Sequence, residues 1–269
     1  MMTVNYAALC VSGFLMLVPF LWMAATSLKA DNEVLSMPLR LIGSRIAFEN
    51  YPRAWNYFPF ARFILNDLFV SAAGTVLALI TSSLSAYAFA RLRFRGKDKL
   101  FFAYLATLMV PQQVVVIPMF LMMKQLGWVN TYWALIIPWA FTAFGTFLLR
   151  QFYMTIPYDL DEAAVIDGCS HFGIYWRIIL PLVRTGLAAL GVFTFIGYWN
   201  SLLWPLIITN QQSLYTLPIG LQMYHGQYGT QWNLLMAAST ITVLPTMIIY
   251  LIAQRHIVQG ITLSGIAGR

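Results

Sequence analysis

Long apolar stretches alternate with short polar segments along the whole chain. A stretch of about 20 apolar residues is long enough to cross a bilayer as a helix. Six stretches are close to that length or longer: about 7–26, 66–90, 100–123, 131–149, 185–208 and 234–254. This pattern predicts an all-α polytopic membrane protein with six transmembrane helices, arranged as a single membrane domain over residues 1–269.

The composition decides how the charge is interpreted. The chain is 60% hydrophobic and only 9% charged, with a mean hydropathy of +0.71, whereas soluble domains average about 25% charged residues. In a membrane protein Lys and Arg mainly report topology, so the net charge of +7 does not indicate a nucleic-acid partner. The first apolar stretch has no basic flank and no obvious cleavage site, which favours a retained helix over a signal peptide.

Basic residues gather on one side of the expected membrane domain. Residues 91–99 contain five of them, and the segments 150–184 and 255–269 contain three and two. With six spans these segments share one side with both termini. Short loops rich in Lys and Arg stay in the cytoplasm, so both termini are expected to be cytoplasmic.

Residues that could support catalysis or metal binding are sparse. The chain has two cysteines, Cys10 and Cys169, and three histidines, without the spacing of a disulfide framework or a metal site. No glycine-rich phosphate loop of the Walker type occurs, so ATP is not expected to bind here. We therefore expect no catalytic residue, no metal and no cofactor in this chain. Asp67 is expected at the membrane interface, because burying a charge in lipid is costly.

The polar segment 150–184 is predicted to form two short helices joined by a hinge. Pro157 suits a helix start, because its missing N–H is one that the first turn leaves unpaired. Gly168 suits a left-handed cap at the end of the first helix, and Ser170 can cap the second. The expected apolar face of the second helix consists of Phe172, Tyr175, Trp176 and Ile179.

The same segment has a recognisable spacing. Glu162-Ala163-Ala164 is followed after three residues by Gly168 and after nine more by Ile178-Ile179-Leu180-Pro181. This spacing resembles the cytoplasmic "EAA" loop of ABC importer permeases. Three further stretches resemble the carbohydrate (MalG-like) branch of that family: Arg150-Gln151-Phe152-Tyr153, Trp199-Asn200-Ser201-Leu202-Leu203-Trp204-Pro205-Leu206 and Tyr228-Gly229-Thr230-Gln231-Trp232.

The resemblance implies a permease subunit of a type I importer in the plasma (inner) membrane of a bacterium or archaeon. Such importers combine two permeases, two ATPase subunits that bind ATP and Mg, and an extracytoplasmic binding protein that delivers a sugar or related small polar solute. The resemblance also assigns contact with the ATPase to one set of residues. These are Glu162, Ala163, Ala164, Asp167, Gly168, Ile178, Leu180 and Pro181, with Glu162 as the charged contact and the two alanines as a close-packed floor.

Polar residues inside the apolar stretches are candidates for the solute pathway. The candidates are Gln112 and Gln113, which follow Pro111, and the adjacent pair Trp199 and Asn200. Polar side chains within a membrane usually face a cavity or the bundle interior. The alternative for the glutamines is equally open: they would satisfy backbone groups freed by Pro111. In maltose-type importers the partner permease supplies the main sugar site, which lowers the expectation of direct solute contact here.

Two segments in the C-terminal quarter of the chain are assigned from the same resemblance. The polar segment 209–233 is expected to reach the binding protein, and the alternative is a passive connector. Its candidate contacts are Gln222, Tyr224, Gly226 and Tyr228. The tail 255–269 contains three glycines and is expected either to regulate the ATPase or to be a functionless end.

Other six-span proteins remain alternatives to an ATP-driven sugar importer. A secondary transporter has no need of a protruding helix that matches an ATPase cleft, and an intramembrane enzyme would need an acid, base or metal cluster. Importers of glycerol-3-phosphate-type solutes share many of the same sequence landmarks, so that solute class also stays open.

The predicted topology can be tested by labelling with a membrane-impermeant thiol reagent on intact cells. Cys10 and Cys169 are first replaced, and single cysteines are placed at Lys97 and Gln211. We expect label only at position 211, because residues 91–99 carry the basic charge that retains a loop in the cytoplasm. Label at position 97 would reverse the orientation.

Overall fold

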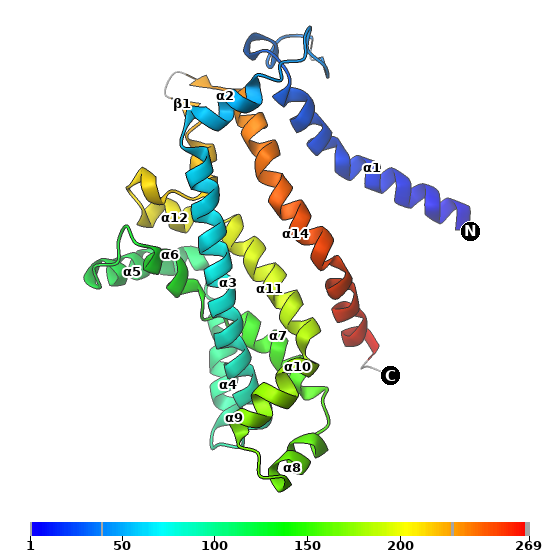
Figure 1. The fold of residues 1–269 in the computed structure, drawn as a ribbon, viewed down its shortest axis with the longest axis vertical. Coiled ribbons are helices and arrows are strands. Elements are labelled where there is room, and N and C mark those ends of the chain that lie inside the picture. Colours follow the sequence, from blue (N-terminus) through cyan, green and yellow to red (C-terminus); the bar gives the residue numbers. More distant parts are fainter. Residues whose placement is uncertain (1, 39, 227–228, 267–269) are drawn as a thin grey trace. The chain divides into compact units, whose positions relative to one another are not determined.

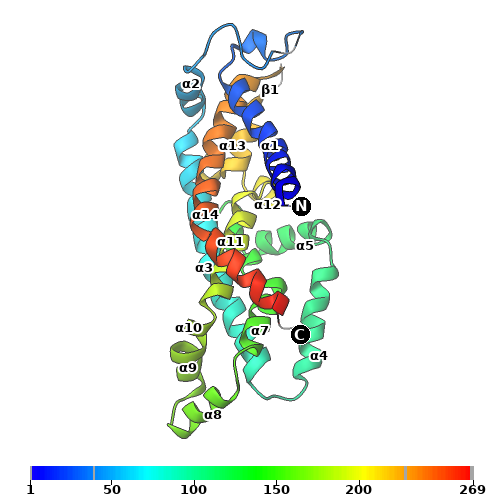
Figure 2. The ribbon, with the colours of Figure 1, turned by 90° about the vertical axis from the view of Figure 1, so that its right-hand side faces the viewer.

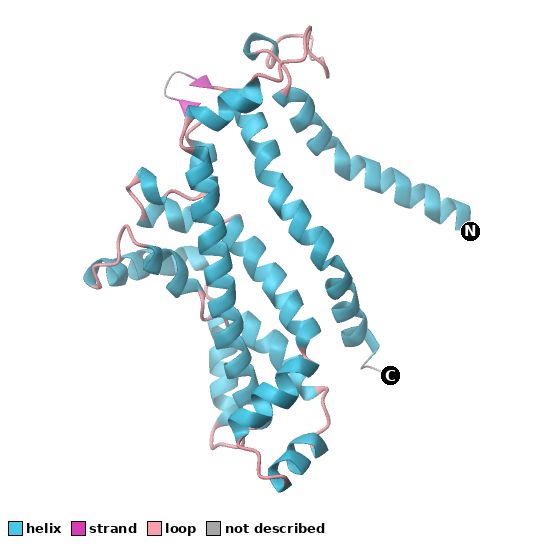
Figure 3. Ribbon diagram, viewed as in Figure 1, coloured by secondary structure: helices cyan, strands magenta, loops and turns pink. Residues whose placement is uncertain are grey.

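A computed structural model of the chain describes residues 2–38, 40–226 and 229–266, and for residues 2–4, 252, 253 and 255–266 it describes the backbone only (Figure 1). Almost every described element is a helix (Figure 3). The only strands among the described residues are β1 (His225–Gly226) and β2 (Gly229–Thr230), which pair antiparallel. The predicted all-α class is confirmed.

The α-helices, in chain order, are α1 (Met2–Ser27), α2 (Asn50–Tyr57), α3 (Phe60–Arg91), α4 (Lys97–Ala106), α5 (Gln112–Gln125), α6 (Tyr132–Ile136), α7 (Ala143–Met154), α8 (Asp159–Ile166), α9 (His171–Ile174), α10 (Leu180–Leu182), α11 (Arg184–Trp199), α12 (Leu203–Ile208), α13 (Leu217–Gln222) and α14 (Trp232–Ile266). Short 3₁₀ helices cover Asp31–Glu33, Thr107–Met109, Ile137–Trp139 and Gln212–Leu214, and a π-helix covers Tyr175–Ile179.

Three helices among the described residues are long and apolar enough to cross a membrane alone: Asn5–Ser27, Phe60–Arg91 and Trp232–Leu251. Three bent helix pairs satisfy the same length and composition together, which brings the number of candidate spans to six at most. The structure therefore agrees with a polytopic membrane protein. The bent pairs are Lys97–Met109 with Gln112–Gln125, Tyr132–Trp139 with Ala143–Met154, and His171–Leu182 with Arg184–Trp199.

The helix pairs bend because of local features that the pattern of apolar stretches does not indicate. The first pair meets at 100°, where Pro111 precedes α5 (Figure 2), since proline lacks the N–H that a continuing helix needs. The third pair bends by 78° and begins at His171, within the segment that the sequence suggested was a cytoplasmic loop. The expected span 185–208 is also divided, because α11 ends at Trp199 and α12 begins at Leu203.

The last helix is longer than the sequence pattern suggested. The apolar stretch was expected to end near residue 254 and to lead into a flexible tail, whereas the backbone of α14 stays helical to Ile266. A glycine inside a helix costs only about 1 kcal/mol relative to alanine, so Gly260 and Gly265 do not prevent it. Residues 267–269, including Gly268, lie outside the described residues.

The chain divides into two compact units, which are described separately. Unit 1 comprises residues 1–65 and 216–247, and unit 2 comprises residues 66–215 and 248–269. Helix α2 organises unit 1 through the buried side chain of Asn50. Its Nδ2 donates to the carbonyls of Ser27 and Lys29, both at 2.8 Å, and its Oδ1 accepts from Asn233 Nδ2 at 3.2 Å. Asn50 therefore joins the end of α1 to the start of α14.

Two apolar clusters stabilise unit 2, and α3 contributes to both. One surrounds Tyr87, Tyr153 and Tyr175, and the other surrounds Val70 and Trp204. Small residues allow the helices to approach closely, as is common for helices in lipid.

Asn50→Ala should destabilise unit 1. The substitution leaves two buried carbonyls without this donor, and each such group costs about 1–3 kcal/mol. The matched control is Asn56→Ala in the same helix, because Asn56 is exposed and makes one bond to the carbonyl of Pro52. Thermal unfolding of the purified variants in detergent should show a lower Tm for Asn50→Ala only. Equal Tm values for the two variants would show that the Asn50 side chain does not stabilise unit 1.

Candidate functional site

The segment from α8 to α10 is built as the sequence suggested at its turn and its second cap. Gly168 has a φ of 80°, in the left-handed region that favours glycine. The amide of Cys169 behind it donates to the carbonyl of Ala164 at 2.9 Å. The hydroxyl of Ser170 accepts from the amide of Gly173 at 3.2 Å and so caps α9. The chain therefore reverses sharply between α8 and α9.

The two alanines of the motif lie in different environments. Glu162 and Ala163 are exposed, whereas Ala164 is 5% exposed and packs into the cluster around Tyr87. Asp167 and Gly168 are exposed as well. Ala164 therefore faces the interior of unit 2, and of the two alanines only Ala163 is on the surface.

The second helix of the segment does not bury the face that the sequence suggested. Tyr175 and Ile179 are buried, while Phe172 and Trp176 are 67% and 59% exposed. A π-helix covers Tyr175–Ile179, and its wider turn changes the spacing of faces relative to an α-helix. Of the remaining motif residues, Ile178 and Leu180 pack partly against the core and Pro181 is exposed.

Arg91 is the residue of this region that sequence reasoning missed. It was interpreted as a topology marker, but its side chain is only 2% exposed and lies against α8. Its Nη1 lies 3.0 Å from Oδ2 of Asp161, an ion-pair distance without hydrogen-bond alignment. Its Nη2 donates to the carbonyl of Ile156 at 2.7 Å, and its guanidinium lies 4.6 Å from the centre of the Tyr158 ring. The available signal was an arginine placed directly at the end of an apolar stretch.

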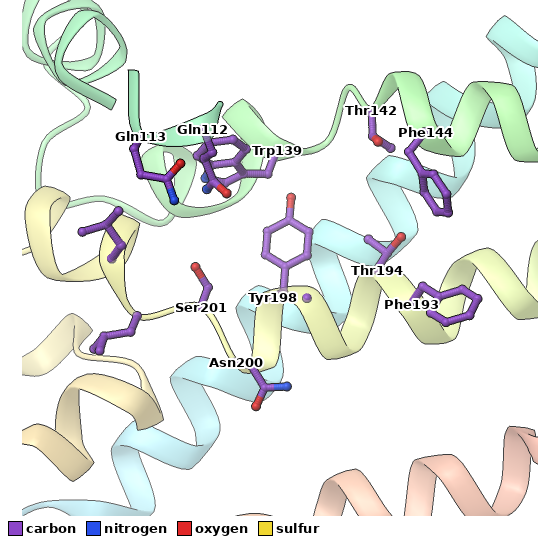
Figure 4. Close-up of a pocket in the computed structure, with 13 residues that line it drawn as sticks. Gln112, Gln113, Trp139, Thr142, Phe144, Phe193, Thr194, Tyr198, Asn200 and Ser201 are labelled. Atoms are coloured by element: carbon purple, nitrogen blue, oxygen red, sulfur yellow. The ribbon is translucent and has the colours of Figure 1, made fainter. Parts of the chain in front are cut away.

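A cavity of about 530 Å³ lies in unit 2 and brings together three of the four candidate pathway residues (Figure 4). Gln112, Gln113 and Asn200 line it, and none of its lining residues is charged. The other lining residues are Trp139, Thr142, Phe144, Phe193, Thr194, Gly197, Tyr198, Ser201, Leu202 and Leu203. Amide, hydroxyl and aromatic groups thus face a common space.

The side chains of the two glutamines are unpaired among the described residues. Gln112 and Gln113 are exposed at the start of α5, and their side-chain amides make no hydrogen bond to another described residue. They therefore do not satisfy backbone groups freed by Pro111 within the described residues. Asn200 differs, because its Nδ2 donates to the carbonyl of Ile196 in the preceding helix α11 at 3.0 Å.

Trp199 does not line the cavity, and its neighbour Tyr198 does. Trp199 is 2% exposed and stacks on Phe195 with ring centroids 5.8 Å apart. Tyr198 donates its hydroxyl to the carbonyl of Ile136 at 2.8 Å. Its ring lies directly over Gly74 of α3, where an added Cβ would come within 2.4 Å of the ring. Helical rotation places adjacent residues about 100° apart, so the sequence motif alone did not separate the two aromatics.

Asp67 is buried inside the protein, contrary to the expectation that its charge would not be buried. It is 0% exposed, and neither carboxylate oxygen has a hydrogen-bond partner among the described residues. The expectation failed because α3 begins at Phe60 and not near residue 66, which places Asp67 two turns inside the helix.

The candidate contacts for a binding protein lie in unit 1. They differ from one another in exposure. Gln222 and Gly226 are exposed. Tyr224 is 1% exposed and donates to the carbonyl of Ala54 at 2.7 Å, and burial raises the pKa of its hydroxyl to about 12. Tyr224 therefore supports the loop from within. Tyr228 lies outside the described residues.

Comparison with known proteins identifies the family. Residues 74–263 match the family described as binding-protein-dependent transport system inner membrane component. The chain belongs to this family. The prediction of an ABC importer permease is confirmed, and the chain is a transport subunit.

Relatives of this permease match along most of its length. The arabinooligosaccharides transport system permease protein AraQ of Halalkalibacterium halodurans is 31% identical, over 100% of this chain and 96% of that protein. The diacetylchitobiose uptake system permease protein NgcG of Streptomyces coelicolor is 31% identical, over 96% and 87%. The sn-glycerol-3-phosphate transport system permease protein UgpE of Yersinia pestis is 38% identical, over 86% and 85%.

Solved structures share the fold. A crystal structure of a bacterial ABC transporter involved in the import of the acidic polysaccharide alginate matches with a TM-score of 0.84 at 24% identity, over 94% of this chain and 95% of that chain.

Among the described residues of the permease, no group of three or more His, Cys, Asp or Glu is placed to hold a metal ion.

Gly74→Ala should destabilise the permease at the cavity wall. The new methyl group would overlap the Tyr198 ring, and overpacking of this kind costs about 1–3 kcal/mol. Gly197→Ala is the matched control, because Gly197 also lines the cavity but has no atom within 4 Å of an added Cβ. Thermal unfolding should show a lower Tm for Gly74→Ala and little change for Gly197→Ala. The same Tm for both would contradict the close contact.

Proposed function

We propose that this permease forms half of the translocation pathway of an ATP-driven importer for a sugar or related small polar solute. The observation that carries the proposal is the exposed Glu162–Ala163 surface of α8, followed by the left-handed turn at Gly168. A short rigid helix that protrudes from the packed part of unit 2 suits a cleft in a partner protein. Exposed Leu160, Val165 and Ile166 extend that surface with apolar area.

The partners follow from this role. Two ATPase subunits would bind ATP and Mg and would receive α8, a second permease would complete the pathway, and an extracytoplasmic binding protein would deliver the solute. Both termini would be cytoplasmic, since residues 91–99 carry five basic residues. Gln222 and Gly226 are the described candidates for contact with the binding protein, and Tyr224 would hold their loop in place.

The cavity supports a neutral, hydroxyl-rich solute. The free amides of Gln112 and Gln113 and the hydroxyl of Ser201 can bond to hydroxyl groups, and Tyr198 and Trp139 offer aromatic surface. The relatives AraQ and NgcG are named for oligosaccharides, and UgpE for glycerol-3-phosphate. A phosphate ester is typically bound by Arg or Lys, and no such residue lines this cavity. This favours the sugar over glycerol-3-phosphate.

ATPase coupling through α8 can be tested by reconstitution of the complete complex in lipid vesicles. Gly168→Val forces a β-branched residue into the left-handed region, at a cost of about 1–3 kcal/mol, and Glu162→Ala removes the exposed charge. We expect both variants to insert and to bind the binding protein, while ATP hydrolysis and uptake fall together. The measurements are co-purification of the ATPase, hydrolysis and uptake.

Two control variants separate coupling from local damage. Gly96→Val imposes the same strain at a φ of 82°, with no atom near an added Cβ, outside the α8–α10 segment. Asp159→Ala removes another exposed charge from the first turn of α8. Both should keep uptake near that of the wild type. Wild-type uptake by the Glu162→Ala, Gly168→Val double variant would refute the coupling role.

A further inference from the structure

Helix α3 carries a line of polar residues at four-residue intervals: Ser83, Tyr87 and Arg91. Residues at this spacing lie on one face of a helix. Each of the three residues contacts the segment that runs from α7 through the π-helix. This segment contains the proposed ATPase contact. The contacts extend over two turns of α3 up to its last residue.

Ser83 and Tyr87 hold the second half of that segment. The hydroxyl of Ser83 lies 2.7 Å from the hydroxyl of Tyr153 and 2.9 Å from that of Tyr175. The Tyr87 hydroxyl donates to the carbonyl of His171 at 3.1 Å, and its ring packs 5.2 Å from the Tyr175 ring. Ser83 and Tyr175 are buried, so these bonds are shielded from competing water.

Arg91 holds the first half. It binds the carbonyl of Ile156 and the carboxylate of Asp161, and the Tyr158 hydroxyl returns a bond to the carbonyl of Ala90 at 2.6 Å. Residues on both sides of Pro157 are therefore attached to the last turn of α3, although 65 residues separate Arg91 from Ile156. The α8 helix is linked along the chain to α7 and α9, and these polar contacts attach it to α3 in addition to the packing of Ala164 in the cluster around Tyr87.

The adjacent carboxylates of α8 face different surroundings. The Asp161 side chain is 17% exposed and faces Arg91, whereas Glu162 is exposed on the outer side. One carboxylate thus lies toward the permease and the other toward the proposed partner.

The same helix reaches the cavity. Gly74 of α3 is covered by the ring of Tyr198, a lining residue, and the hydroxyl of Thr81 donates to the carbonyl of Ala140 next to the lining residue Trp139. Gly74 and Arg91 are about 26 Å apart along the axis, at 1.5 Å per residue. The helix α3 is uninterrupted between them.

We infer that α3 carries the movement of the α8–α9 segment to the cavity, and that Arg91 is the positioning residue that joins the two elements. The inference rests on the proposed function. A continuous helix moves as a rigid rod, so a displacement at Arg91 reaches Gly74 and the Tyr198 ring.

The test uses the assembled importer in vesicles and measures the solute transported per ATP hydrolysed. Arg91→Gln should insert and retain its ATPase subunits, but the ratio should fall about tenfold, within the usual range of coupling between sites. Arg93→Gln is the matched control, because Arg93 is exposed two residues away and removes the same charge. Asp161→Asn should lower the ratio as Arg91→Gln does, and the double variant should lose little more than either. A wild-type ratio in Arg91→Gln would overturn the inference.

A distance measurement decides the question if Arg91→Gln fails to assemble. With Cys10 and Cys169 replaced by alanine, spin labels are placed at Arg93 and at Asp159, which is exposed in the first turn of α8. Pulsed electron paramagnetic resonance should give the same label distance in nucleotide-free and ATP-bound complexes, because α3 and α8 move together. A change larger than the width of the distance distribution would overturn the inference.

Failure of the proposed function has a different signature. Wild-type vesicles would then show no ATP-driven uptake at all, and the inference would fall with it. Wild-type uptake combined with independent movement of α3 and α8 would leave the importer intact and reject only the role of α3.

Discussion

The guanidinium of Arg91 is the interaction on which the α8 end of unit 2 depends. It lies at the C-terminal end of α3, where a helix favours positive charge, and it is almost completely buried against Ile156, Tyr158 and Asp161. A buried guanidinium without partners would be costly, since its desolvation must be offset by bonds with good geometry. The chain after α7 is therefore constrained to return to α3, and this fixes where α8 begins.

Two buried asparagines also hold irregular backbone in place, but they do so without adding charge. Asn50 donates to two carbonyls in unit 1, and Asn66 in unit 2 donates to the carbonyls of Ser213 and Tyr215, both at 2.9 Å. Each also accepts a bond at its oxygen, from Asn233 and from the Tyr132 hydroxyl respectively. One amide satisfies three groups that would otherwise lack partners away from water. Helix ends that leave the regular ladder are stabilised in this way in both units.

Apolar surface remains exposed where function would need partners or lipid. The apolar window of α1 is 0% buried, as expected for a helix whose surroundings are lipid or another subunit. Phe172 and Trp176 are exposed beside α8, on a segment that follows a polar turn. Contiguous exposed apolar residues of this kind mark interaction surfaces. They agree with a permease that works only as part of an assembly.

The sequence by itself determined the class of the fold, the family and the turn at Gly168. Lengths of apolar stretches, the Glu162-Ala163-Ala164 spacing and the conformational freedom of glycine are local properties, and each can be assessed within about 20 residues. The proline-related bend before α5 was visible as Pro111, but its angle depends on what the flanking helices pack against.

Only the tertiary structure decided which side chains share a site. Arg91 and Asp161 are 70 residues apart and Tyr224 and Ala54 are 170 apart in the sequence, so no local pattern could pair them. Tyr198 lines the cavity where Trp199 was the expected residue, and the Tyr198 ring packs over Gly74 of α3. Asp67 was misplaced because α3 extends beyond the apolar stretch that defined it. Burial and partner choice are properties of packed helices, and they arise only when distant segments of the chain meet.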